Sequence, residues 1–208
     1  MCSIFGSFSK DKIVELAELN RYRGQHSYSY SYYHPDTNDI TVSKGLGDIP
    51  LDQIKIPEGA YCIAHMQAPT TDNKTIESVH PAFTQGVWLW HNGIIKDHWV
   101  KNAMKEYNLD ISWDTFLILH KYLSTGKLDD IVGTFSCAYS GNKSLQLFRN
   151  EISPLFIDDN YNISSTKFEG SKSLEPNIIW KFHPGIGINK IGSFNTVENP
   201  YFFMDEVA

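Results

Sequence analysis

The sequence predicts an α+β protein whose sheets are mainly antiparallel. Strand-like segments come first along the chain, helical segments occupy the middle, and strand-like segments return in the last third. This order is typical of folds that segregate helices from antiparallel strands, and the short turns between neighbouring strands favour hairpins over parallel crossovers. Because no repeat, low-complexity linker or clear boundary divides the 208 residues, we expect one domain over residues 2–208.

The first third of the chain is predicted to contain three strands and one helix. Residues 2–8 form a short apolar run, and a helical pattern begins after Ser9 and ends before Arg23. Residues 27–33 alternate serine with tyrosine, which places the aromatic rings on one face of a strand and the hydroxyl groups on the other. A further strand is expected over residues 40–43.

The middle of the chain is predicted to add two strands joined by a polar loop. Residues 60–66 and 87–91 are apolar runs of strand length, and residues 67–80 between them are polar. The second run ends at Asn92-Gly93, a pair that is typical of turns.

Two helices and then hairpin-like strands are predicted from residue 97 onward. One helix begins near Asp97 and the other covers about 113–124, each with apolar side chains on one face. Short strand-like pieces, interrupted by proline and glycine, occupy the last forty residues. The predicted strand pairs before them are 133–140 with 144–149, and 154–158 with 161–165.

The composition argues against several classes of function. The formal net charge is −6 and no basic stretch is concentrated, so nucleic acid is not expected as a partner. No apolar run reaches the roughly 18 residues that a membrane span needs, and charges near the start interrupt any signal peptide. Three cysteines, Cys2, Cys62 and Cys137, indicate reduced thiols in a cytoplasmic protein. The eight histidines lack the spacing of zinc proteases, and we expect neither a metal nor another cofactor.

The second residue is the strongest functional signal. A chain that begins Met1-Cys2 normally loses its initiator methionine because the next side chain is small, and Cys2 would then carry both a thiol and an α-amine. A thiolate is a strong nucleophile, and an α-amine titrates near neutral pH. One residue would thus supply a nucleophile and its base. The alternative is that cysteine at this position has no role.

The pair Asn92-Gly93 has a structural and a catalytic interpretation. After an apolar strand, Asn-Gly is usually a turn. The side-chain amide of Asn92 and the backbone N–H of Gly93 could instead both donate to one developing oxyanion, since glycine allows close approach to the backbone. Acyl transfer to a thiol requires such donors.

Three further segments admit either a binding role or an ordinary structural role. Arg23 and Gly24 are typical of helix C-termini. His65 and Gln67 belong either to a strand that runs into a polar loop or to a substrate-binding loop. Asp114 at the start of a helix either complements the helix dipole or binds the ammonium group of a ligand.

In this order, the segments resemble the glutaminase domain of class II glutamine amidotransferases, which are N-terminal nucleophile hydrolases. The likeness covers roughly residues 2–170. It rests on Met-Cys-Ser-Ile-Phe-Gly at the start, Tyr-Arg-Gly at 22–24, Ile-Ala-His at 63–65, His-Asn-Gly-Ile-Ile at 91–95, Asp-Thr at 114–115, and the strand segments at 133–138 and 147–156.

The resemblance implies a fold, a reaction and a set of site residues. The fold would be a four-layer αββα sandwich of two mainly antiparallel sheets. Cys2 would attack the side-chain amide of L-glutamine and form a thioester, with Asn92 and Gly93 as oxyanion donors. Ammonia would pass to a separate synthase subunit, because little chain remains for an acceptor domain, or the enzyme would be a free-standing glutaminase. The implied substrate-binding residues are Arg23, His65, Gln67 and Asp114, the last of which would hold the α-ammonium group.

Two departures from the family leave the substrate open. Gln67 stands where the family usually has an arginine that binds the α-carboxylate, and an amide cannot form a charged bidentate pair. Either Arg23 or Lys74 supplies the charge, or glutamine binds weakly, or the substrate lacks that carboxylate. The family's acidic residue soon after Arg-Gly is also replaced, by Gln25-His26. An amide hydrolase for another substrate and a non-catalytic regulatory or interaction protein therefore remain alternatives.

Overall fold

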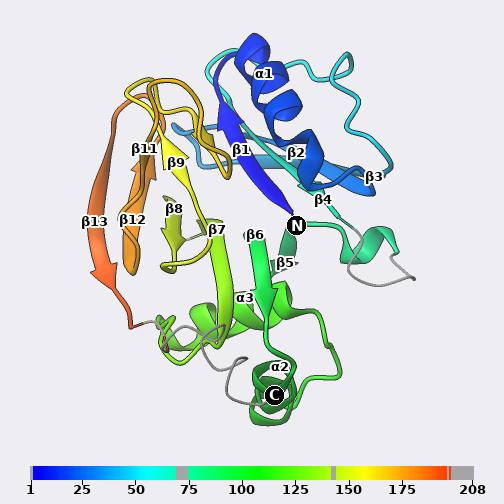
Figure 1. Cartoon of the computed structure of the whole chain (residues 1–208), viewed down its shortest axis with the longest axis vertical. Helices are drawn as coiled ribbons and strands as arrows, with labels where there is room; N and C mark the ends of the chain where they lie inside the picture. The colour runs from blue at the N-terminus through cyan, green and yellow to red at the C-terminus, as the bar shows by residue number, and fades with distance from the viewer. Residues whose placement is uncertain (1, 69–74, 142–143, 196, 198–208) are drawn as a thin grey trace, which may run out of the picture.

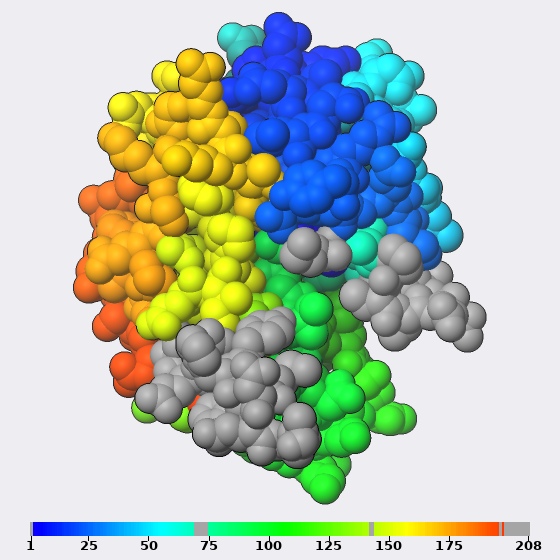
Figure 2. Space-filling model, in the orientation of Figure 1, coloured from blue at the N-terminus to red at the C-terminus, as the bar shows by residue number. Residues whose placement is uncertain are grey.

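Two antiparallel sheets with helices on their outer faces make up the computed structural model (Figure 1). The structure describes residues 2–68, 75–141, 144–195 and 197. In the space-filling view, the N-terminal segments in blue border the yellow and orange segments, and the green middle of the chain lies below them (Figure 2).

The first sheet has its most central strand at the start of the chain. Its strand order is β11-β9-β10-β1-β4-β2-β3, and every described pair is antiparallel. The strands are β1 (Ser3–Ser7), β2 (Ser27–Tyr33), β3 (Ile40–Leu46), β4 (Tyr61–Gln67), β9 (Phe156–Ile157), β10 (Ile163–Ser164) and β11 (Lys172–Ser173). Because β1 is hydrogen-bonded on both sides, the backbone that follows Cys2 is held firmly in place.

The second sheet brings the middle and the last part of the chain together. Its strand order is β13-β12-β8-β7-β6-β5, again with antiparallel pairs. The strands are β5 (Ala82–Thr84), β6 (Val87–Ile95), β7 (Gly133–Gly141), β8 (Ser144–Arg149), β12 (Ile178–His183) and β13 (Gly187–Ser193).

The helices pack on opposite outer faces of this pair of sheets. Helix α1 (Lys10–Asn20) lies on β1 and β4, and the 3₁₀ turn η1 (Arg21–Arg23) continues it. Its first turn is capped by the Ser9 hydroxyl, which accepts a hydrogen bond from the Lys12 N–H at 3.3 Å. The remaining helical elements are η2 (Ile76–Ser78), α2 (Asp97–Tyr107) and α3 (Asp114–Thr125), of which α3 packs on β5 and β6.

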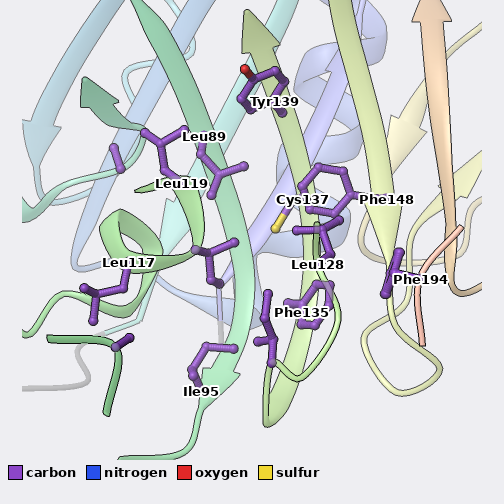
Figure 3. Packing of buried hydrophobic residues seen from close by; sticks show 14 of the residues in the cluster. Leu89, Ile95, Leu117, Leu119, Leu128, Phe135, Cys137, Tyr139, Phe148 and Phe194 are labelled. Carbon is purple, nitrogen blue, oxygen red and sulfur yellow. The ribbon is translucent and has the colours of Figure 1, made fainter. Parts of the chain in front are cut away.

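Three buried apolar clusters separate the four layers. One joins α1 to the outer face of the first sheet through residues such as Phe5 and Leu16. The second lies between the sheets and includes Ile63 and Trp90. The third joins α2 and α3 to the second sheet (Figure 3), and its members include Leu89, Leu117, Leu119, Cys137 and Phe148. This arrangement confirms the α+β class and the αββα sandwich.

The alternating segment in β2 is covered on both faces. Tyr33 packs in the cluster between the sheets, so Ser29 and Ser31, which share its side of the strand, also point between the sheets and are fully buried. Tyr30 and Tyr32 point the other way and pack against the α1 cluster. The tyrosine face is therefore half-buried packing surface.

The expectation that the strand of residues 87–91 ends at a turn was wrong. Strand β6 continues to Ile95, and Asn92 and Gly93 pair with Ser136 and Phe135 of β7. Regular pairing with a long central neighbour outweighs the local turn preference of Asn-Gly. The strands predicted at 154–158 and 161–165 are shorter than expected, with two residues each in β9 and β10.

In the described part of the chain, no helix is long and apolar enough to cross a membrane.

Candidate active site

A cavity of about 750 Å³ opens beside the start of β1. Its walls come from the first residue before β1, the end of β4, the second half of β6, helix α2 and the segment that leads into α3. Four of the predicted site residues line it: Cys2, Gln67, Gly93 and Asp114. Residues that are distant along the sequence thus meet at one place.

Cys2 is buried, with 6% of its surface exposed, and it borders the cavity directly before β1. The other two cysteines lie in apolar cores. Burial raises the pKa of the Cys62 thiol to about 12 and that of Cys137 well above its usual range. Both therefore remain protonated and unreactive at neutral pH, which leaves Cys2 as the cysteine suited to nucleophilic chemistry. Met1 lies outside the described residues.

Asn92 is linked to the strand that follows Cys2 through one buried hydroxyl. Its Nδ2 lies 3.3 Å from the Ser165 Oγ and 3.4 Å from the Ser136 Oγ. The Ser165 Oγ also accepts a hydrogen bond from the Ile4 N–H at 3.0 Å, and the Ser165 N–H donates to the Ile4 carbonyl at 2.8 Å. Ser165 therefore fixes the Asn92 amide relative to the backbone two residues beyond Cys2.

Gly93 is required for close packing of β6 on β7. A Cβ atom added there would overlap the Thr134 carbonyl group, which is backbone and cannot move aside. The next N–H along the strand, that of Ile94, donates to the Thr134 Oγ1 at 3.0 Å. Gly93 also lines the cavity. The same residue therefore allows the two strands to pack closely and presents its backbone to the cavity.

Three histidines form a compact group at the base of the cavity. The rings of His65 and His80 stack with centroids 4.2 Å apart, and the His65 Nε2 lies 3.0 Å from the His91 carbonyl oxygen. The Thr115 Oγ1 lies 2.7 Å from the His80 Nε2 and 3.1 Å from the His91 Nδ1. His80 and His91 line the cavity, whereas His65 is fully buried beside them and supports β6.

Asp114 presents a carboxylate to the cavity from the first turn of α3. Its side chain is 28% exposed. The Oδ1 accepts a hydrogen bond from the Thr115 N–H at 2.7 Å, and the Oδ2 lies 3.9 Å from the His91 Nδ1. One oxygen is thus hydrogen-bonded within the first turn of α3, while the other is placed to bind a cation in the cavity.

Gln67 is held rigidly at the end of β4. Its side-chain Oε1 accepts a hydrogen bond from the Ser27 Oγ at 3.2 Å, and its carbonyl accepts one from the His26 N–H at 3.0 Å. A Cβ added at Gly24 would overlap the backbone of Gln67 and Ala68, so this glycine allows η1 to approach β4. Because the amide oxygen is already bonded, the amide nitrogen is the group that Gln67 can offer to a ligand.

The predicted cation Arg23 is engaged outside the cavity wall. Its Nε donates to the Thr166 Oγ1 at 2.9 Å and to the Tyr22 hydroxyl at 3.1 Å. Lys74, the other cation considered, lies outside the described residues. Among the described residues that line the cavity, Lys101 on α2 is the one lysine or arginine.

Lys44 of β3 fixes the segment that carries His80. Its Nζ donates to the carbonyl oxygens of Val79 and Pro81 at 2.6 and 2.7 Å. Burial lowers the pKa of Lys44 to about 8, although the nearby Glu77 carboxylate acts in the opposite direction. The cation therefore fixes the backbone on both sides of His80.

Within the described residues, no group of three or more His, Cys, Asp or Glu side chains is arranged to hold a metal ion.

Comparison with known proteins supports the resemblance seen in the sequence. No family model matches the chain. Glutamine–fructose-6-phosphate aminotransferase (isomerizing) of Rhizobium meliloti is 32% identical over 103 residues, which are 47% of this chain and 17% of that enzyme. This partial match includes no more than about half of the chain.

Solved structures match over a larger share of the chain. The glutamine phosphoribosylpyrophosphate amidotransferase of B. subtilis, complexed with ADP and GMP, has a TM-score of 0.68 at 18% identity and covers 91% of this chain. The allosteric regulatory enzyme of purine biosynthesis has a TM-score of 0.68 at 16% identity and covers 92%. The chain spans 49% and 48% of these two proteins. The likeness confirms the predicted fold.

Proposed function

We propose that this protein releases ammonia from the side-chain amide of glutamine through a thioester at Cys2. The observation that carries the proposal is the single cavity lined by Cys2, Gly93 and Asp114. A nucleophile, a backbone oxyanion donor and an anchor for an ammonium group are the three elements that amide hydrolysis of an amino acid requires. Two of the similar proteins named above are a glutamine–fructose-6-phosphate aminotransferase and a glutamine phosphoribosylpyrophosphate amidotransferase, which supports this choice of reaction.

The proposed reaction begins after Met1 has been removed. The α-amine of Cys2 accepts the thiol proton, directly or through a water molecule, and the sulfur attacks the amide carbon. A C–S bond forms, the C–N bond breaks, and the amine returns the proton to the departing ammonia. Water then attacks the thioester, the C–S bond breaks, and the carboxylate product leaves the thiol regenerated.

Asn92 and Gly93 would stabilise the oxyanion of the tetrahedral intermediates. The hydrogen bonds from the Asn92 Nδ2 to the two serine hydroxyls are long, at 3.3 and 3.4 Å. Hydrogen bonds in an unliganded site commonly shorten or change partner when substrate binds. We expect one of the two Nδ2 hydrogens to turn from its serine to the oxyanion while the other keeps the side chain in position.

Substrate binding is assigned to Asp114 at the α-ammonium group and to Gln67 at the neighbouring α-carboxyl group. The Asp114 carboxylate would bind the α-ammonium group as a charge-assisted hydrogen bond. His65 and Arg23 would act indirectly, because His65 supports β6 from behind and Arg23 is bonded to the Thr166 hydroxyl.

The ammonia is proposed to be used by a separate synthase subunit, with residues 2–208 acting as the glutaminase domain. A hydrolase for a different amide is the second candidate function, and Gln67 is the observation that favours it, because its amide does not supply the positive charge that an α-carboxylate favours. A non-catalytic regulatory role is the third, and it predicts no turnover of any amide.

Ammonia release by purified full-length protein tests the proposal. We expect turnover of a glutamine amide by the wild type and none by Cys2→Ala. The variant Cys62→Ala is the matched control, since it removes a buried thiol of the α1 cluster that does not line the cavity and should keep the same kcat. Wild-type activity in Cys2→Ala would refute the mechanism.

A further inference from the structure

The cavity has a charged partner for the α-ammonium group of a free amino acid at Asp114, but a neutral side chain, Gln67, for its α-carboxylate group. Asp114 presents a carboxylate to an α-ammonium group, and the Thr115 N–H donates a hydrogen bond to its Oδ1. At the Gln67 end the ligand meets a neutral amide whose oxygen is bonded to the Ser27 hydroxyl. An amide N–H suits a carbonyl oxygen, whereas a desolvated carboxylate favours a charged partner, and within the described part of the cavity wall Lys101 of α2 is the one lysine or arginine.

Part of the cavity wall is apolar. Ile94, Val100, Met104 and Trp113 contribute to its wall. Ile94 is 52% exposed, although its side chain is large and apolar. Cavities of about 300–1,000 Å³ accommodate drug-sized ligands, so about 750 Å³ exceeds the space that one amino acid needs.

We infer that the preferred substrate is a glutamine with its α-amine free and its α-carboxyl group blocked as an amide, namely the N-terminal glutamine of a peptide. Asp114 binds the terminal ammonium group, the Gln67 amide donates to the first peptide carbonyl, and the second residue lies on the wall formed by Ile94, Val100 and Met104. This inference rests on the proposed function.

The reaction remains a hydrolysis and needs no further co-reactant. Peptidyl glutamine and water give peptidyl glutamate and ammonia, through the same C–S bond to Cys2. An N-terminal glutamine can also cyclise by attack of its own amine on the side-chain carbonyl, which releases ammonia as well. Binding of the amine as an ammonium ion by Asp114 prevents that attack, so the enzymatic product is the open glutamyl peptide.

The test compares L-glutamine with the dipeptides Gln-Gly and Gln-Leu. Ammonia release is measured with full-length protein, and mass spectrometry separates the glutamyl product from the cyclised one. We expect kcat/KM for Gln-Leu to exceed that for L-glutamine by at least about tenfold, the scale of an unpaired buried charge, with the glutamyl dipeptide as product.

A pair of exposed-isoleucine variants tests the apolar wall without disturbing the core. Ile94→Asn should lower kcat/KM for Gln-Leu by about three- to tenfold relative to Gln-Gly, the scale of losing part of an apolar contact. Ile191→Asn is the matched control, because Ile191 is 50% exposed on β13 and is expected to have no effect.

The outcomes separate this inference from the proposed function. If L-glutamine is hydrolysed as well as or better than Gln-Leu, or if Ile94→Asn has no selective effect, the inference is overturned while Cys2 chemistry on glutamine stands. If the wild type hydrolyses none of the three amides, the inference and the proposed function both fail.

Discussion

Ser165→Ala is the sharpest probe of how the proposed oxyanion donor is held. The substitution removes a hydroxyl that accepts from the Ile4 N–H at 3.0 Å and contacts the Asn92 Nδ2 at 3.3 Å. A buried N–H left without a partner costs about 1–3 kcal/mol of folding stability. Complete removal of one oxyanion donor lowers kcat by a factor of roughly 10²–10³. Since Ser136 still contacts Asn92, we expect a smaller loss of kcat, about 10- to 30-fold.

Ser164→Ala is the matched control for this prediction. Ser164 is the neighbouring residue and is equally buried, but its hydroxyl accepts from Asn20 and Thr166 instead. Both variants should lose similar free energy of unfolding in denaturant titrations, yet only Ser165→Ala should lower kcat. Equal loss of kcat in the two variants, or an unchanged kcat in Ser165→Ala, would show that Ser165 does not position Asn92.

Three further predictions follow from the same geometry. Asp114→Asn should raise KM by about 10- to 100-fold with kcat changed much less, as loss of a charged hydrogen bond implies; steady-state kinetics would decide. Gly93→Ala should destabilise the fold by about 1–3 kcal/mol because its Cβ meets the Thr134 carbonyl, measurable by thermal unfolding. Burial lowers the pKa of Lys44 to about 8 in the folded protein, against roughly 10.4 in the unfolded chain. Between pH values of about 8 and 10.4 the unfolded chain therefore binds more protons than the folded protein. Stability should therefore rise with pH there, by about 1 kcal/mol after allowance for partial solvent screening, and Lys44→Met should lack that rise.

Much of the fold could be predicted because local patterns agree with the tertiary structure. The alternation over residues 27–33 matches β2 residue for residue, and the helical pattern after Ser9 matches α1. The turn expected at Asn92-Gly93 was wrong because pairing with β7 depends on residues more than forty positions away. Short strands such as β5 have too few residues to give a pattern.

The candidate site was only partly accessible from sequence. Cys2, Gln67, Gly93 and Asp114 were predicted and lie around one cavity. Ser165 was not predicted, because a buried serine that bridges two strands carries no local signal. The contribution of Ile94 to an apolar cavity wall was also not predicted. An isoleucine at the end of a strand is normally assigned to the hydrophobic core unless its neighbours in space are known.

Cys2, with its own α-amine, is proposed as the nucleophile that attacks a glutamine amide. Intact mass and peptide mapping, after incubation with a diazo-ketone analogue of glutamine in its α-carboxylate and α-carboxamide forms, test this most directly. We expect loss of Met1 and a single adduct on Cys2 from at least one form. Retained Met1, or no adduct on Cys2 with either form, would contradict the proposal.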